Sequence, residues 1–129
     1  MKYRSTRSQS PEYSFKEAVL LGLAPDGGLI VPESIPKIKD LDSLRSMDFQ
    51  QLSSYIFGLY CDDIPPESIQ ALVQQSYCAE NYGGEVAPTV CLDGDSNLHI
   101  LELFHGPTLA FKDVALQLLC RVFEYILNE

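Results

Sequence analysis

A single lysine, Lys112, lies in a long apolar run near the C-terminal end of the chain, and this run reads as one helix over residues 109–127. At about 100° per residue, the polar residues after Lys112 fall in a stripe roughly 80° wide, which we expect to face solvent. These residues are Asp113, Gln117, Arg121, Glu124 and Asn128. Lys112 lies roughly 140° from the centre of the stripe, so it is predicted to point toward the apolar side. Its neighbours there are Leu116, Leu119 and Phe123.

This predicted position bears on the chemistry of the Lys112 amine. In the first turn of a helix the dipole places partial positive charge, which disfavours an ammonium. Burial among apolar side chains disfavours the charged form as well. A neutral amine can condense with an aldehyde to give a Schiff base and can later carry a proton, although the neighbouring Asp113 favours the ammonium. From the pattern alone, a lysine whose side chain reaches past its neighbours to water stays an open alternative.

The loop before the helix, His105 to Thr108, is short and rich in turn residues. Thr108 is predicted to cap the helix N-terminus, and Gly106-Pro107 is an ordinary turn sequence. A strand end, a glycine-containing loop and a helix N-terminus together make a place where α/β proteins collect ligands. The segment around Lys112 is therefore a candidate binding site.

Several shorter elements must position this segment. Ser14 and Glu17 have the spacing of a capping box, Asp48 is a candidate helix cap, and Pro66 suits a first helical turn. The predicted elements are a strand over residues 2–6, a helix over 15–23, a strand over 29–31, helices beginning near 49 and 66, hairpin strands over 86–92 and 98–104, and the helix over 109–127. The second hairpin strand is mostly apolar, so we expect it to be buried.

The order of these elements indicates a mixed fold. A small α+β unit, rich in helix and ending in a hairpin, passes near residue 98 into the start of an α/β unit. We therefore divide the chain into residues 1–97 and residues 98–129. The second part holds a first strand and the helix that carries Lys112.

Composition and charge argue against several function classes. The net charge of −9 disfavours nucleic acid as a partner, because phosphate binding needs clustered lysine and arginine. No apolar stretch approaches the roughly 20 residues that span a membrane, and the N-terminus lacks the layout of a signal peptide. The four cysteines and two histidines are not spaced as metal ligands, so we expect no metal site and reduced thiols in a cytoplasmic protein.

The string LELFHGPTLAFKDVALQLL, which carries Lys112, resembles the pyridoxal phosphate lysine segment of threonine synthases. Further strings match upstream in family order and at family-like spacing. They are YRSTR at residues 3–7, SF and EA around residues 14–18, GLAPDGGL at residues 22–29 and IP at residues 35–36. The resemblance covers nearly the whole chain and is to the branch found in fungi and many bacteria.

The resemblance implies a fold, a reaction and a site. The fold would be that of the fold-type II, tryptophan-synthase β-like pyridoxal phosphate enzymes, preceded by a family-specific N-terminal α+β domain. The reaction would convert O-phospho-L-homoserine and water to L-threonine and phosphate. Lys112 would form the Schiff base with pyridoxal 5′-phosphate and later move protons among the substrate carbons. Phe111 would border the cofactor ring, whereas Thr108 and Asp113 belong to the matching string without an assigned role.

Members of this family are several times longer than 129 residues. Their glycine-rich phosphate loop lies downstream, and Gly27-Gly28 and Gly83-Gly84 cannot replace it, because each precedes a strand-like run rather than a helix. We therefore expect the chain to be the N-terminal portion of a threonine synthase, inactive alone and without a tight hold on the cofactor. Two alternatives stay open: a threonine-synthase-like phospho-lyase that releases a keto acid, and a non-enzymatic α+β interaction module. The sequence predicts no oligomeric state.

Overall fold

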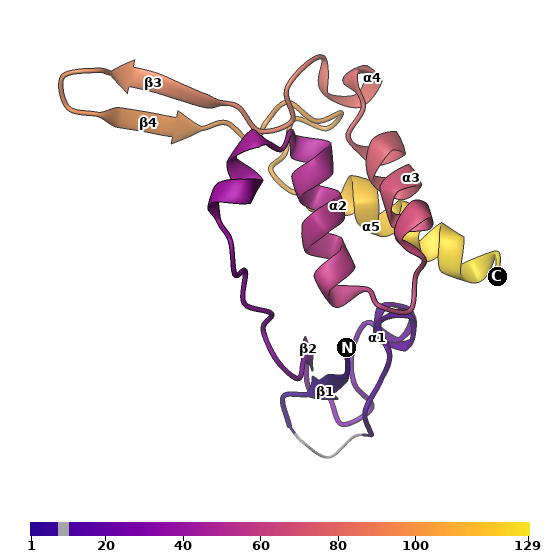
Figure 1. Cartoon of the computed structure of the whole chain (residues 1–129). Coiled ribbons are helices and arrows are strands. Elements are labelled where there is room, and N and C mark those ends of the chain that lie inside the picture. The colour runs from indigo at the N-terminus through magenta and orange to yellow at the C-terminus, as the bar shows by residue number, and fades with distance from the viewer. Residues whose placement is uncertain (8–10) are drawn as a thin grey trace.

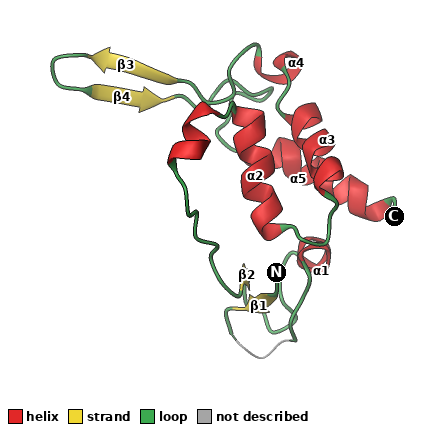
Figure 2. Ribbon diagram, in the orientation of Figure 1, coloured by secondary structure: helices red, strands yellow, loops and turns green. Residues whose placement is uncertain are grey.

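The computed structural model describes residues 1–7 and 11–129 of the chain. It shows a mixed α/β architecture, in which helices form the body and two small antiparallel sheets lie at opposite ends (Figures 1 and 2). The elements in chain order are β1 (Tyr3–Ser5), α1 (Phe15–Leu21), β2 (Ile30–Pro32), the 3-10 helix η1 (Asp42–Ser46), α2 (Phe49–Tyr60), α3 (Pro66–Ser76), α4 (Ala79–Tyr82), β3 (Thr89–Asp93), β4 (Leu98–Leu101) and α5 (Asp113–Leu127).

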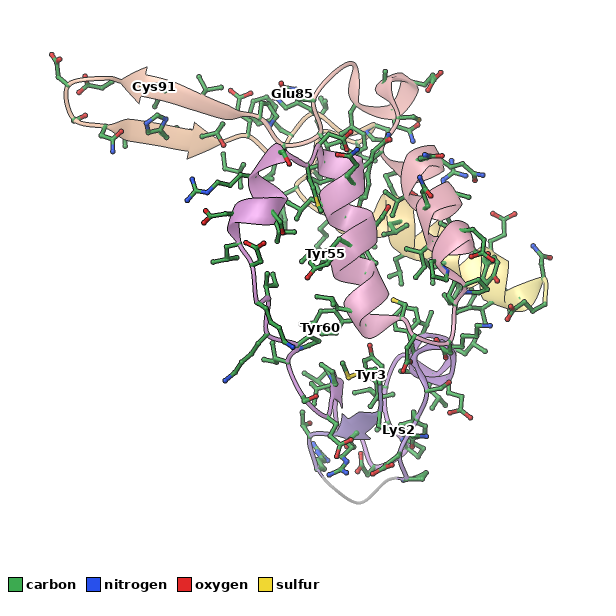
Figure 3. The ribbon with its side chains drawn as sticks, in the orientation of Figure 1. Lys2, Tyr3, Tyr55, Tyr60, Glu85 and Cys91 are labelled. Atoms are coloured by element: carbon green, nitrogen blue, oxygen red, sulfur yellow. The ribbon has the colours of Figure 1, made fainter. Side chains whose placement is uncertain are left out.

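The N-terminal sheet is joined to the helices through its first strand. β1 pairs with β2 in an antiparallel register that places Tyr3 opposite Pro32, and Tyr3 also forms a β-bridge with Tyr13. The phenol of Tyr3 donates a hydrogen bond of 2.9 Å to the carbonyl oxygen of Tyr60 at the end of α2. Figure 3 shows these two tyrosines between the sheet and the helix. The sheet is thereby fixed to the helical body.

The strings YRSTR and PDGG, distant in the sequence, meet at the edge of this sheet. The hydroxyl of Ser5 donates to Asp26 Oδ1 at 2.7 Å, and the guanidinium of Arg7 donates to the carbonyl oxygen of Asp26 at 3.2 Å. A Cβ on Gly28 would lie 2.1 Å from Ser5 Oγ, so only glycine fits there. The two strings therefore form one packed unit.

A capping box begins helix α1 and a glycine ends it. The hydroxyl of Ser14 accepts a hydrogen bond from Glu17 N, and the Glu17 carboxylate accepts one of 2.8 Å from Ser14 N. The predicted capping box is thus confirmed. Helix α1 ends at Leu21, two residues earlier than predicted, because Gly22 adopts a positive φ of 68° that terminates the helix.

Helices α2, α3 and α5 pack around the main core, and α5 lies behind the other two in Figure 1. The buried apolar side chains of this core are Cys61, Ile64, Ile69, Leu72, Val73, Tyr77, Tyr82, Val86, Leu118, Val122 and Ile126. The sequence predicts an apolar stripe along the third helix, formed at helical spacing by Ile69, Leu72, Val73, Ser76 and Tyr77. All five residues are buried, so this prediction is confirmed. The phenol of Tyr77 donates to the carbonyl oxygen of Val114 at 2.7 Å, and Ser76 Oγ lies 3.3 Å from the carbonyl oxygen of Gln117. These contacts connect the end of α3 to α5.

Strands β3 and β4 form a hairpin that extends away from the helices (Figure 1). The hairpin itself was predicted, but the expected burial of residues 98–104 is wrong over β4, because every residue from Thr89 to Leu101 is exposed. The ribbon stands clear of the helical core, so its apolar side chains have no described element to pack against. Both strands are also shorter than predicted, and β3 begins just after Pro88, which has no N–H for a strand ladder.

Helix α5 has two apolar faces, whereas the sequence pattern suggested one. Leu118, Val122 and Ile126 are buried in the core. The second face, which includes Leu116, Leu119 and Phe123, is exposed at 44%, 47% and 40% respectively. No described element covers this second face.

The polar stripe predicted to face solvent on this helix is wrong in part. Asp113 is only 3% exposed, and Gln117 and Arg121 are half-buried. Asp113 is covered by the loop before α5. Gln117 and Arg121 lie at the edge of the polar stripe that faces α3, where they contact Ser76 and Gln75. Periodicity locates the faces of a helix but not the partners that cover them.

Candidate functional site

Lys112 lies immediately before α5, in the N-cap position, with φ −64° and ψ −21°. Its carbonyl oxygen accepts hydrogen bonds from Ala115 N at 3.0 Å and Leu116 N at 2.8 Å. The lysine side chain is exposed, so its predicted burial is wrong. The physical reason is that α5 begins at Asp113, four residues later than predicted, and that the apolar neighbours of Lys112 are themselves uncovered.

An open apolar groove runs between α1, α2 and α5, and Lys112 lies on its wall beside Phe111. The groove is lined by aromatic and aliphatic side chains, among them Phe15, Phe49, Ile56, Phe57, Leu118 and Leu119. Phe111 is 67% exposed, so its ring is available to a bound group. The structure therefore brings together the two sequence-predicted site residues, one amine and one aromatic ring, at the edge of an apolar surface.

The start of α5 is organised by the carboxylate of Asp113. Asp113 Oδ2 accepts a hydrogen bond of 2.8 Å from Thr108 N, and Oδ1 accepts one of 2.9 Å from Thr108 Oγ1. The prediction of Thr108 as the helix N-cap is therefore wrong, since Thr108 is a donor to Asp113 five residues later. Thr108 lies within a turn closed by Leu109 N to Gly106 O, and a second turn, closed by Asp113 N to Ala110 O, precedes the helix, each bond being 3.0 Å long.

Two backbone features show how tightly this loop is packed. A Cβ on Gly106 would lie 2.4 Å from the Cβ of Asp113, so only glycine fits against that side chain. Leu109 adopts φ 60°, the left-handed region, which costs a non-glycine residue about 1–2 kcal/mol. The surrounding hydrogen bonds must supply the free energy that holds Leu109 in this conformation.

A histidine–carboxylate pair lies in the segment just before this loop. His105 Nε2 lies 2.7 Å from Glu102 Oε2, and both side chains are half-buried. The imidazole stacks on Phe104 with the ring centroids 4.7 Å apart. The sequence reasoning missed this pair, although the spacing of Glu102 and His105, three residues apart in the same loop, was a visible signal.

Some site types are absent from the part of the chain that the structure describes. Residues 1–7 and 11–129 contain no group of three or more His, Cys, Asp or Glu side chains that could hold a metal ion. All four cysteines are free thiols. None of the described helices is both long and apolar enough to cross a membrane. The lysine segment is therefore the best-defined candidate site.

Comparison with known proteins identifies the family. Residues 2–77 match the family model described as "Threonine synthase N terminus". The chain belongs to the threonine synthase family. Threonine synthase of Methylobacillus glycogenes is 44% identical across 100% of this chain and 29% of its own length. Threonine synthase of Saccharomyces cerevisiae is 47% identical across 98% of this chain and 26% of its own length.

The fold agrees with this family membership. The crystal structure of PLP-bound threonine synthase from Brucella melitensis matches with a TM-score of 0.92 at 39% identity, over 99% of this chain and 28% of that one. The small mixed α/β fold described above is thus that of the N-terminal part of threonine synthase structures. The chain spans less than a third of the length of these threonine synthases.

Part of this segment suits pyridoxal phosphate. The cofactor offers an aldehyde, which needs an accessible amine, and a flat pyridine ring, which suits apolar or aromatic walls. Lys112 supplies an exposed amine, and it shares the groove with Phe111 and other apolar side chains. These residues fit the aldehyde and one side of the ring.

The cofactor phosphate has no comparable cradle among the described residues. Phosphate is well held by free N–H groups at a helix N-terminus. At the start of α5, however, Thr108 N already donates to the carboxylate of Asp113, whose negative charge would repel a phosphate. The glycine pairs at residues 27–28 and 83–84 lead toward strands β2 and β3. The segment thus provides the amine but no phosphate site.

Proposed function

We propose that this chain is the N-terminal part of a threonine synthase that converts O-phospho-L-homoserine and water to L-threonine and phosphate. Lys112 is the residue that holds pyridoxal 5′-phosphate covalently, through its Nζ. The observation that carries the proposal is the placement of Lys112 within FHGPTLAFKD: its backbone is fixed at the start of α5 while its amine is exposed beside an apolar groove. The family membership of the chain supports the same reading.

The residues of this segment have separable tasks. Pyridoxal phosphate, when bound, supplies an electron sink for the reacting carbons of the substrate. Nζ of Lys112 would hold the cofactor and would accept and return protons at the α, β and γ carbons of the substrate. Phe111 packs along the ring, and the apolar wall of the groove lies beside both residues. The protein thereby selects which bond breaks.

The proposed organisation follows from these tasks. Residues 1–97 form the threonine synthase N-terminal domain, and residues 98–129 form the first strand and the lysine-bearing helix of a fold-type II, tryptophan-synthase β-like domain. The exposed second face of α5 and the exposed hairpin are the surfaces on which the remaining family segment would pack. The chain by itself is inactive and releases pyridoxal phosphate on dialysis, because it supplies no phosphate cradle.

A chimera tests this function directly. This chain replaces the aligned N-terminal portion of the S. cerevisiae threonine synthase, to which it is 47% identical. We expect the purified chimera to show the near-visible absorption of bound pyridoxal phosphate and to form threonine and phosphate from O-phospho-L-homoserine. Lys112→Ala should abolish both the absorption and the turnover.

Lys37→Ala provides the matched control, because Lys37 is also an exposed lysine but is not among the residues that line the groove. It should leave absorption and turnover unchanged. A Lys112→Ala chimera that keeps normal absorption and turnover would contradict the proposal. So would a folded wild-type chimera without cofactor, which would favour a non-enzymatic module.

A further inference from the structure

We propose that Asp113 is a positioning residue for Lys112. Its buried carboxylate clamps the loop of residues 106–109 to the start of α5, so that the lysine backbone is fixed while the lysine side chain stays free. This inference rests on the proposed function of Lys112, and it gives a role to Asp113, for which the sequence predicted none.

The clamp is built from both carboxylate oxygens. Asp113 is 3% exposed, and its two oxygens accept hydrogen bonds of 2.8 and 2.9 Å from Thr108 N and Thr108 Oγ1. These bonds close a ring of six residues, 108–113, in which Lys112 is the last residue before the clamp. Beyond the ring, the Lys112 carbonyl oxygen accepts two bonds from the first turn of α5. The lysine backbone is therefore restrained from both sides.

The clamp also explains a strained residue. Leu109 lies inside the ring with φ 60°, and its side chain is 74% exposed, so side-chain packing does not hold it there. A non-glycine residue persists in this conformation when its surroundings over-determine it, and such residues cluster at functional sites. Here the surroundings are the Thr108–Asp113 bonds and the contact of Gly106 with Asp113. The strain is thus a consequence of fixing the loop.

The donors to Asp113 bear on the chemistry of the lysine. Both hydrogen bonds come from neutral groups of Thr108, and the ion pairs found among the described residues include neither Asp113 nor Lys112. A carboxylate paired with the ammonium would hold the lysine side chain in place. Because its oxygens are directed to Thr108, the carboxylate restrains the backbone without tying up the Lys112 amine.

Amide hydrogen exchange on the 129-residue chain tests whether the clamp exists. In Asp113→Ala the amides of Thr108 and Leu109 should exchange at least about tenfold faster, because local protection depends on their hydrogen bonds. Ser76→Ala serves as the control: Ser76 is fully buried against α5, so its loss should lower the thermal midpoint without selectively affecting Thr108. If Asp113→Ala does not fold, Thr108→Val removes only the hydroxyl donor and should accelerate exchange at Leu109, and Thr108→Ser should restore it.

The chimera with the S. cerevisiae protein tests positioning. Asp113→Ala should retain bound cofactor but lower kcat at least about tenfold with a smaller change in KM, as expected when a reacting group is misplaced. Asp113→Asn, which keeps the shape and one acceptor oxygen, should recover part of kcat. Ser76→Ala should leave kcat unchanged despite its lower thermal midpoint.

The outcomes separate this inference from the proposed function. An inactive Lys112→Ala chimera together with wild-type kcat in Asp113→Ala, or with unchanged exchange at Thr108 and Leu109, would overturn the positioning role alone. An active Lys112→Ala chimera would overturn the proposed function, even where exchange still shows the clamp.

Discussion

Replacing Gly106 by alanine should destabilise the fold because the new methyl group has no room. A Cβ at this position would lie 2.4 Å from Asp113 Cβ, 2.5 Å from its Oδ2 and 2.8 Å from its Cγ, whereas carbon atoms in contact are about 3.5–4.0 Å apart. The loop must move away from α5, which breaks the two hydrogen bonds from Thr108. Hydrogen bonds to a charged group are worth about 1.5–3 kcal/mol each. Because Thr108 is exposed and water can replace its partner, we expect a loss of about 2–4 kcal/mol in the free energy of unfolding.

Gly58→Ala is the matched control, and it should increase the free energy of unfolding instead of lowering it. Gly58 lies inside α2, and a Cβ added there would have nothing within 4 Å, while alanine favours a helix interior over glycine by about 0.8–1 kcal/mol. Urea unfolding followed by far-ultraviolet circular dichroism measures both variants. The reasoning would be refuted if Gly106→Ala changed the free energy of unfolding by less than about 0.5 kcal/mol, the usual scatter of surface substitutions, while Gly58→Ala stabilised as expected.

Three further outcomes follow from burial and exposure. Iodoacetamide at pH 8 should label Cys91 and Cys120, which are exposed. It should spare Cys61, because burial raises the pKa of the Cys61 thiol to about 12. Peptide mass mapping that found Cys61 labelled first would contradict this prediction. Burial likewise raises the pKa of the Tyr77 phenol to about 12. The contribution of the neutral phenol to the free energy of unfolding is therefore fully present below about pH 10 and is lost as the pH rises toward 12. Urea midpoints at increasing pH should show this fall, and Tyr77→Phe should make it shallower; an equally steep fall in that variant would be evidence against the assignment. The uncovered apolar face of α5 should make the chain self-associate. Leu119→Lys should reduce this association in sedimentation velocity, since Leu119 is 47% exposed on that face, and an unchanged distribution of sedimentation coefficients would show that this face does not self-associate.

Local features of the fold could be predicted from the sequence because their partners are close in the chain. The capping box of Ser14 and Glu17 and the helix start at Asp48 depend on residues three positions apart, and both are confirmed. The buried stripe around Val73 follows from helical periodicity alone. Short-range hydrogen bonding and periodicity were sufficient for these elements.

The start of α5 could not be predicted in this way. The apolar run extends back to Leu109, but the helix begins only at Asp113, because Asp113 accepts its hydrogen bonds from Thr108 and packs against Gly106. These contacts form through two turns and a left-handed residue, which no helical pattern encodes. The same shift leaves Lys112 exposed at the helix start instead of buried in its first turn.

Burial depends on tertiary partners, and the sequence pattern misjudged it where those partners were unexpected or missing. The β3–β4 hairpin formed near its predicted position, yet it is exposed throughout because it stands away from the helices. Asp113 belongs by periodicity to a solvent stripe, yet it is buried because the loop before α5 covers it. A carboxylate can be buried when its oxygens accept hydrogen bonds. The donor to Asp113 is Thr108, which the sequence pattern predicted to be the helix N-cap.

The central claim, that Lys112 anchors pyridoxal phosphate, is tested most directly by chemical trapping. Borohydride reduction of the chimera with bound pyridoxal phosphate, followed by proteolysis and peptide mass spectrometry, identifies the modified lysine. We predict one pyridoxyl group on Lys112, with none on the exposed lysines Lys2, Lys37 and Lys39. A stoichiometric adduct on any other lysine, with Lys112 unmodified, would contradict the claim.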